Sequence, residues 1–240
     1  MSNPDLVLWI LALLPVLVLA VFVYVMDRYE KEPLWMLLKA FFCGVLAVVA
    51  VVPLEQLLSP FAPGGAVLHG LYDGFVVAGF SEELCKLLVF MLFIWRSRHF
   101  NEYFDGIVYA VYVGLGFACL ENVGYVFQSG MFQENLVTGV TRALLSVPAH
   151  FLFAVAMGYY LSKAKFEAAN RFSSLLKALF YPLLLHGTFD ALLMVSDNLR
   201  STVLYPVTVV LFLVFIRFDI KMWKKGMVKI REMQERSRMQ

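Results

Sequence analysis

The sequence has few charged residues, three cysteines and four histidines among its 240 residues. Charged side chains make up 16% of the chain and hydrophobic ones 61%, whereas soluble domains average about 25% charged and 45–50% apolar residues. The cysteines lie in apolar segments and form no spaced pair in a loop, which argues against a disulfide framework or a zinc knuckle. We expect no nucleic-acid partner. The composition is that of a membrane protein.

Two familiar sequence signals are also missing. Residues 1–5 carry no basic side chain and no small-residue cleavage site follows the first apolar segment, so we expect no cleaved signal peptide. The zinc-protease pattern His-Glu-x-x-His does not occur. There is no internal repeat and no low-complexity tract.

Long apolar stretches dominate the sequence, and a membrane span needs roughly 20 mostly apolar residues. They cover about residues 6–26, 34–54, 74–95, 104–127, 138–161, 174–196 and 201–218. The sequence predicts an all-α, polytopic membrane helix bundle with about seven transmembrane helices. Residues 1–218 would form one seven-span domain, and residues 219–240 a basic cytoplasmic tail.

Basic residues gather in alternate connections between these stretches. They are Arg28 and Lys31 in the first, Arg96 and Arg98 in the third, Lys163, Lys165 and Arg171 in the fifth, and seven in the tail from Lys221. The intervening connections are nearly free of basic charge. Because cytoplasmic loops are enriched in Lys and Arg, this alternation predicts an outside N-terminus and a cytoplasmic C-terminus.

Ionisable and amide side chains interrupt four of the apolar stretches. They are Glu82, Glu83 and Lys86; Glu121 and Asn122; His150; and His186 and Asp190. A charge at the centre of a span costs roughly 2.5–3.5 kcal/mol on insertion scales, and such residues are usually functional. We therefore take this set as candidate catalytic residues.

Position along each helix indicates that these residues meet. Counted at about 1.5 Å per residue, all lie between the midplane and the outer interface. Glu82 and Lys86 are four residues apart, as are His186 and Asp190, so each pair shares a helix face. The sequence predicts a shared polar cavity in the outer half of the bundle.

Carboxylates and histidines in a partly dry site suggest hydrolysis. A buried glutamate can take a proton from an attacking water, while histidine, asparagine or lysine stabilises the oxyanion. The same set can instead hold a metal such as zinc, through His150, His186 and either Asp190 or a glutamate such as Glu83, with one position open for water. The sequence leaves the metal open, and no cofactor is certain.

The order of the polar motifs resembles the PrsW family of bacterial intramembrane proteases. The matching stretches, spread over residues 20–195, are Asp27-Arg28-Tyr29-Glu30-Lys31-Glu32-Pro33, Glu82-Glu83-Leu84-Cys85-Lys86, Phe104-Asp105-Gly106-Ile107-Val108-Tyr109, Gly116-Phe117-Ala118-Cys119-Leu120-Glu121-Asn122-Val123-Gly124-Tyr125, Arg142-Ala143-Leu144-Leu145 with Pro148-Ala149-His150, and His186-Gly187-Thr188-Phe189-Asp190. Each motif is weak alone, but their order is specific.

This resemblance implies a multi-pass protease of the bacterial cytoplasmic membrane. Its substrate would be a single-pass membrane protein, typically an anti-sigma factor, cut on the extracytoplasmic side in a stress response. The wider group of CAAX prenyl endopeptidases is distantly similar: Glu82-Glu83 matches its paired glutamates and His186-x-x-x-Asp190 its His-x-x-x-Asn. Glu121 stands where that group has histidine, and His150 could take the missing histidine's part.

Three other functions use similar residues. A transporter also places carboxylates and histidines at mid-depth, although it usually has related halves or broken helices. A membrane zinc hydrolase of lipid amides is a second alternative, but its His-x-x-x-His spacing is absent. A silent receptor or scaffold is the third. For a protease, membrane lipid surrounds the chain and the substrate helix must unwind to expose an amide, which is easiest near the outer interface.

Overall fold

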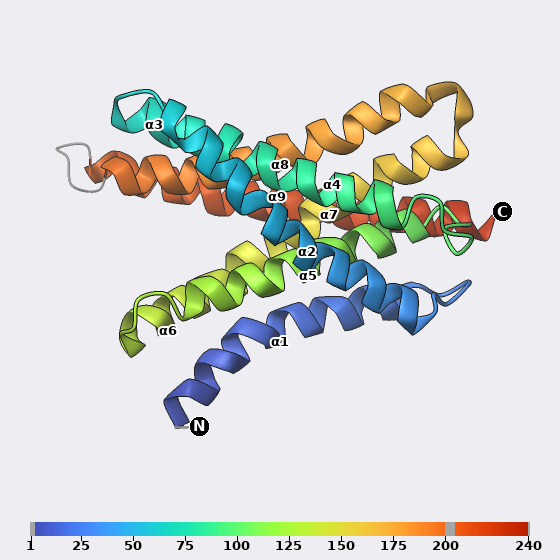
Figure 1. Ribbon diagram of the computed structural model, residues 1–240, viewed down its shortest axis with the longest axis horizontal. Helices are drawn as coiled ribbons and strands as arrows, with labels where there is room; N and C mark the ends of the chain where they lie inside the picture. Colours follow the sequence, from blue (N-terminus) through green and yellow to red (C-terminus); the bar gives the residue numbers. More distant parts are fainter. Residues whose placement is uncertain (1–2, 200–204, 240) are drawn as a thin grey trace.

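The structure is a computed structural model that describes residues 3–199 and 205–239 (Figure 1). In these residues every regular element is helical, which confirms the predicted all-α fold. The helices are α1 (Asn3–Met26), α2 (Leu34–Leu58), α3 (Ala66–Tyr72), α4 (Ser81–Phe93), α5 (Asp105–Val126), α6 (Phe132–Thr141), α7 (Val147–Phe166), α8 (Arg171–Leu199) and α9 (Tyr205–Arg238). Two π-helical segments, η2 (Asp73–Phe80) and η3 (Arg142–Ser146), and two 3₁₀ turns, η1 (Ser59–Phe61) and η4 (Ala168–Asn170), complete the set.

The long helices run along the long axis of the molecule, with α5 in the middle (Figure 1). Helix α5 packs against α1, α2, α4, α6 and α7, and α8 packs against α3, η2, α7 and α9. Most of α5 is buried, whereas α1 and α2 expose a large share of their apolar side chains. Apolar side chains on an outer helix face are what a lipid-facing surface requires.

Within residues 3–199 and 205–239, five helical stretches are long and apolar enough to cross a membrane: Asp5–Met26, Leu34–Phe61, Asp105–Val126, Phe132–Phe166 and Ala168–Leu199. They coincide with five of the predicted spans. The predicted span 74–95 falls on η2 and α4, where charged residues interrupt the apolar run. The predicted span 201–218 begins outside the described residues and continues in α9. The chain is a helical membrane bundle, and the count of seven spans stays a prediction.

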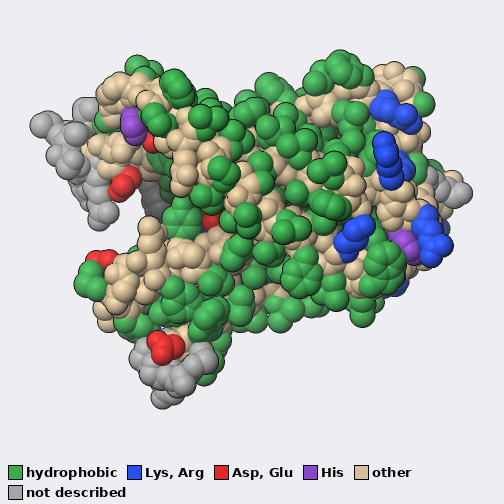
Figure 2. Space-filling model, in the orientation of Figure 1, with side chains coloured by type: hydrophobic (Ala, Val, Ile, Leu, Met, Phe, Trp, Pro, Cys, Tyr) green, Lys and Arg blue, Asp and Glu red, His purple; other side chains and the backbone are tan. Residues whose placement is uncertain are grey.

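Charge separates along the long axis. Figure 2 shows lysine and arginine side chains over one end of the molecule and acidic side chains over the other. The basic end holds the C-terminus and the turns between α1 and α2, α4 and α5, and α7 and α8 (Figure 1). The basic connections thus lie together at one end, and the orientation with a cytoplasmic C-terminus stays a prediction.

Residues 219–238, predicted as part of a tail, continue α9 without a break and pack on the bundle. Met222, Ile230 and Met233 are buried on this helix. Gly226 lies so close to Leu152 of α7 that an added Cβ atom would stand 2.5 Å from its Cδ2. The boundary at residue 218 stays a prediction, but no structural division occurs there.

Glycines let the helices that carry the polar residues approach closely. A Cβ atom on Gly114 of α5 would lie 2.7 Å from the Ala154 side chain and 3.3 Å from the His150 carbonyl oxygen on α7. On α8, a Cβ atom on Gly187 would overlap the ring of Phe75. Small residues at helix contacts are typical of membrane bundles, and here they bring α5, α7 and α8 within side-chain reach of α4.

Candidate active site

Two π-helical segments precede the polar residues of the bundle. Segment η2 ends at Phe80, directly before Ser81, Glu82 and Glu83, and η3 ends at Ser146, four residues before His150. Each added residue in a helical turn rotates the next side chain by about 100°, and π turns occur often at functional sites. The two segments therefore set which face of α4 and α7 points inward.

Lys86 lies at the centre of the buried cluster. Its Nζ donates to Glu82 Oε2 at 3.0 Å and to Glu83 Oε1 at 2.8 Å. The same nitrogen lies 3.3 Å from His150 Nδ1 and 3.9 Å from the centre of the Phe117 ring. Glu82, Glu83, Lys86 and His150 are polar yet almost fully buried, and the apolar Phe117 is buried as well. One ammonium group thus connects α4 with α5 and α7.

His186 on α8 is held between carboxylates. Its Nδ1 lies 2.9 Å from Glu83 Oε1, and its Nε2 lies 3.0 Å from Asp190 Oδ2. Glu82 Oε2 is 3.8 Å from the same Nε2. Carboxylates only accept hydrogen bonds, so in the metal-free site each ring nitrogen that bonds to one carries a proton. The Glu83 Oε2 atom is buried and has no hydrogen-bond partner.

A second ion-pair group joins α5 to α7 and η3. Glu121 Oε2 lies 2.8 Å from His150 Nε2 and 2.9 Å from Arg142 Nη2. The Arg142 guanidinium also lies 4.4 Å from the centre of the Tyr125 ring. His150 therefore stands between the Glu121 carboxylate and the Lys86 ammonium, which links the two groups into one network.

Asn122 does not reach the glutamates or the histidines. Its Oδ1 accepts a bond from Arg142 Nε at 2.9 Å, and its Nδ2 donates to the Ala12 carbonyl oxygen at 2.8 Å. The side chain thus ties α1 to η3 and holds Arg142 beside Glu121. In this arrangement Asn122 positions Arg142 and contacts none of the other candidate residues.

Aromatic rings form the apolar walls of the cluster. The Phe153 ring stacks on His186 with centroids 4.6 Å apart and an angle of 20°. The two histidine rings are 5.1 Å apart and nearly perpendicular. These rings exclude water from one side of the imidazoles, and a dry environment strengthens electrostatic interactions.

A cavity of about 440 Å³ reaches the cluster between α2 and α5. Glu82 and Glu121 line it together with Glu55, Phe117 and Tyr125. Figure 2 shows the molecule hollowed at its acidic end, where the C-terminal ends of α2 and α5 lie (Figure 1). Both candidate carboxylates can therefore meet water and a ligand, whereas Glu83 is fully buried.

Sequence reasoning missed Glu55 and gave Arg142 little weight. Glu55 lies one residue beyond the predicted end of the second span, but α2 continues to Leu58 and carries it to the cavity. Arg142 could have been weighted more because it lies two helical turns before His150 on the same apolar stretch. Glu55 lies in no matching motif and the motif around Arg142 does not reveal its partners, so only helix packing shows where both side chains lie.

The donor atoms suit a metal ion. Glu82, Glu83, His150 and His186 each offer one atom, and these atoms lie within 4.8 Å of one another. Of the ligands predicted from the sequence, Glu83, His150 and His186 belong to this group, whereas Asp190 contacts only His186 within it. Two imidazoles and a carboxylate are a common ligand set for catalytic zinc. The Glu83 Oε2 atom, which has no hydrogen-bond partner, is a further oxygen that could ligate the ion.

A helical membrane bundle that gathers glutamates, histidines and a lysine beside one cavity has the features of a membrane-embedded functional site. Comparison with known proteins identifies the group. The model of a family described as PrsW family intramembrane metalloprotease matches residues 32–217. No solved structure matches the chain.

Curated relatives cover most of the chain. It is 37% identical over 233 residues to Protease PrsW of Clostridioides difficile (strain 630), covering 96% of this chain and 93% of that protein. It is 37% identical over 185 residues to Protease PrsW of Bacillus subtilis (strain 168), covering 77% and 81%. For Protease PrsW of Geobacillus kaustophilus (strain HTA426) the identity is 38% over 184 residues, covering 77% and 78%.

The chain belongs to the PrsW family of intramembrane metalloproteases. It is therefore an enzyme, a peptidase, and a multi-pass bacterial membrane protein. This agrees with the resemblance found in the motifs.

Proposed function

We propose that this peptidase hydrolyses a peptide bond of a single-pass membrane protein, such as an anti-sigma factor, near the outer membrane interface. The observation that carries the proposal is the shared cavity, because Glu82 and Glu121 line it while Lys86 and His150 stand directly behind them. An unwound substrate segment entering between α2 and α5 would meet both carboxylates. Family membership favours this function over the transporter and the lipid-amide hydrolase.

Glu82 is the group that we assign as general base. Its carboxylate faces the cavity, whereas the Glu83 carboxylate is buried and bonded to Lys86 and His186. A general base must reach the water that it deprotonates. Asp190 instead orients His186 through Nε2, as carboxylates commonly do for metal-binding histidines, and leaves Nδ1 on the side of Glu83.

Zinc fits the donors Glu83, His150 and His186, and when bound it would polarise the carbonyl group and lower the pKa of water. Lys86 has a separate task, because its ammonium neutralises Glu82 and Glu83 at 3.0 and 2.8 Å. Glu121 fixes His150 from the other side of its ring. These contacts hold each side chain before substrate arrives, and preorganised groups contribute most to catalysis.

The test is cleavage in cells. The chain is co-expressed with a panel of epitope-tagged single-pass membrane proteins, including anti-sigma factors, and processing is followed by immunoblot. We expect at least one to be cut, and Glu82→Gln to lower the cleavage rate by about 10²–10⁴-fold, the usual contribution of a general base. Glu134→Gln, which changes an exposed glutamate of α6, is the matched control.

Full cleavage by the Glu82→Gln variant would disprove its role as base. If that variant and Glu83→Gln, His150→Gln and His186→Gln all kept full activity, the whole site assignment would be wrong. Mass spectrometry of the product ends would also locate the cleaved bond. A bond deep on the cytoplasmic side would contradict the proposed depth.

A further inference from the structure

A second cavity lies away from the candidate active site, in a groove between α7, α8 and α9. Its volume is about 360 Å³, which is within the range of about 300–1,000 Å³ for ligand sites. The floor is apolar and includes Leu152, Val155, Leu185 and Met222. None of the residues of the catalytic network lines it. We call it the α9 groove.

One wall of the α9 groove is a row of lysines. Lys221, Lys225 and Lys229 recur every four residues on α9 and all line the groove. Lys229 is paired with Glu232 at 3.0 Å and lies 4.0 Å from the Tyr159 ring centre. In the described part of the chain, no carboxylate forms an ion pair with Lys221 or Lys225. The row thus has two ammonium groups without an anionic partner.

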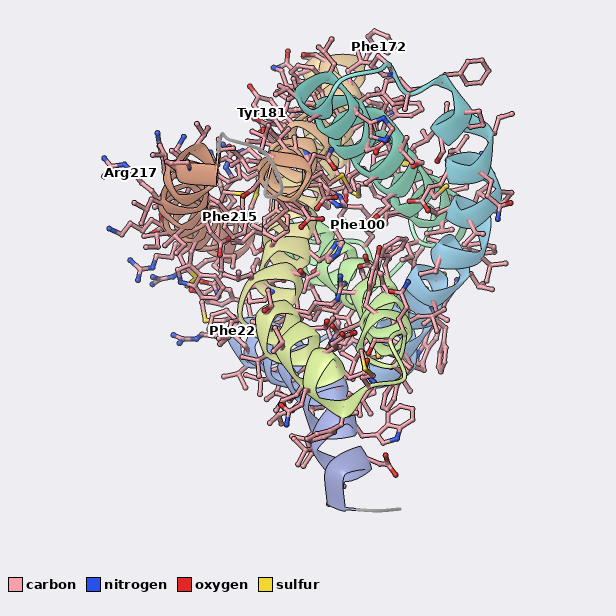
Figure 3. All side chains as sticks on the ribbon, turned by 90° about the vertical axis from the view of Figure 1, so that its left-hand side faces the viewer. Phe22, Phe100, Phe172, Tyr181, Phe215 and Arg217 are labelled. Carbon is pink, nitrogen blue, oxygen red and sulfur yellow. The ribbon has the colours of Figure 1, made fainter. Side chains whose placement is uncertain are left out.

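The opposite wall carries tyrosines. Tyr160 of α7 and Tyr181 of α8 line the groove and stack with ring centroids 4.8 Å apart at 11°. Figure 3 shows α9 at the edge of the bundle, with Tyr181 beside it on α8 and Arg217 pointing away from the bundle. Tyrosines are enriched where a membrane protein meets lipid headgroups, since the ring is apolar and the hydroxyl polar.

The lysine row and the apolar floor lie side by side on the flank of a membrane bundle. An ammonium group next to hydrocarbon is costly unless it reaches water or an anion. Basic pockets between transmembrane helices near the cytoplasmic side commonly bind anionic lipid headgroups. The charges and the apolar floor together complement one molecule that has both an anionic head and a hydrocarbon tail.

We propose that the α9 groove binds an anionic phospholipid. Its phosphate would lie against Lys225 and its neighbours in the row, and an acyl chain would cover the apolar floor. The lipid would thereby connect α9 to α7 and α8. An acidic protein segment also matches the lysines, but it does not match the apolar floor that opens to the side of the bundle.

The experiment measures lipid binding and needs no cleavage, so it stands apart from the proposed protease function. Purified full-length protein is delipidated and placed in nanodiscs of phosphatidylcholine, alone or mixed with phosphatidylglycerol. Retained lipid is identified by native mass spectrometry after release in detergent, and affinity is measured by titration with phosphatidylglycerol. We expect the native chain to retain phosphatidylglycerol in preference to phosphatidylcholine.

The test variant is Lys221→Gln/Lys225→Gln/Lys229→Gln. Each lysine near an anionic lipid contributes about fivefold in affinity, so the variant should bind phosphatidylglycerol roughly 100-fold more weakly. The control, Arg217→Gln/Lys224→Gln/Arg231→Gln, removes the same charge from exposed positions of α9 outside the groove and should change affinity less than threefold. If the triple variant fails to fold, Lys225→Gln alone replaces it, and it should bind phosphatidylglycerol about fivefold more weakly.

Equal losses in the test and control variants would overturn the proposal, because the effect would then be that of net charge. So would equal binding of the two lipids by the native chain. Displacement of the lipid by inorganic phosphate alone would show that the groove recognises only an anion. Displacement by a poly-glutamate peptide, but not by excess phosphatidylglycerol, would show that it recognises an acidic protein segment instead.

Discussion

Removing the Lys86 ammonium should cost more stability than any other single charge change in the bundle core. The variant Lys86→Met keeps the length and apolar character of the side chain but leaves Glu82 and Glu83 without their shared cation. Both ion pairs are buried, with side-chain exposures of 4% for Lys86, 7% for Glu82 and 1% for Glu83. Buried charges cannot regain hydration when their partner is lost.

The magnitude follows from the two distances. At 3.0 and 2.8 Å, each pair has a gross attraction of roughly 5–6 kcal/mol at an effective dielectric constant of about 20. Much of this attraction offsets the cost of burying the charges. The loss on removing one partner is about 3–5 kcal/mol, and we expect that loss in the free energy of unfolding.

The assay is reversible unfolding of the chelated protein in mixed micelles, followed by tryptophan fluorescence. The matched control is Lys177→Met, which changes an exposed lysine of α8 and should alter stability by less than about 0.5 kcal/mol. A second-site change, Glu82→Gln in the Lys86→Met chain, removes one unpaired carboxylate and should recover part of the loss. The coupling between the two sites should be about 0.5–3 kcal/mol.

Two results would refute this reasoning. The first is a loss of less than about 1 kcal/mol for Lys86→Met, the typical value of an exposed ion pair. The second is strict additivity of the two changes, which would mean that Lys86 and Glu82 do not interact in the folded protein.

Three further predictions follow from other parts of the structure. Gly116→Val should cost several kcal/mol in unfolding free energy, because its Cβ would overlap the Phe41 carbonyl oxygen, whereas Gly124→Ala should be neutral, since nothing lies within 4 Å of that position. Burial, as the largest influence, raises the pKa of Glu32 from its ordinary value of 4.5 to about 7. Between these two values the native state holds a proton that the unfolded chain has released, so stability should fall as pH rises from about 4.5 to 7, and Glu32→Gln should make this slope shallower. Zinc added to the chelated protein should raise its melting temperature, and His186→Ala should remove that shift; an unchanged rise in the variant would exclude His186 as a ligand.

Much of the bundle could be predicted from the sequence because the signals are local. An apolar run of about 20 residues predicts a membrane helix wherever its neighbours lie. The five long apolar helices fall on predicted spans for this reason. Counting along each helix also predicted that Glu82, His150 and His186 meet, and the structure brings these side chains together.

The ends of helices, and helices that combine apolar with charged residues, were less predictable. The second helix was expected to end at residue 54 but continues to Leu58, which puts Glu55 at the cavity. The segment around Glu82 and Glu83 is helical, yet its charges keep it out of the set of long apolar spans. Local hydropathy cannot tell a loop residue from a helical residue that faces a polar cavity.

The sequence by itself determined the fold class and the membrane location, because both depend on composition and on the length of apolar runs. Only the tertiary structure decided the partners. Glu121 and Asn122 are adjacent, so their side chains point about 100° apart; Glu121 meets His150 whereas Asn122 turns to Arg142 and α1. Pairing across helices depends on how each helix is rotated about its axis and how closely it packs, and both are set by contacts between distant segments.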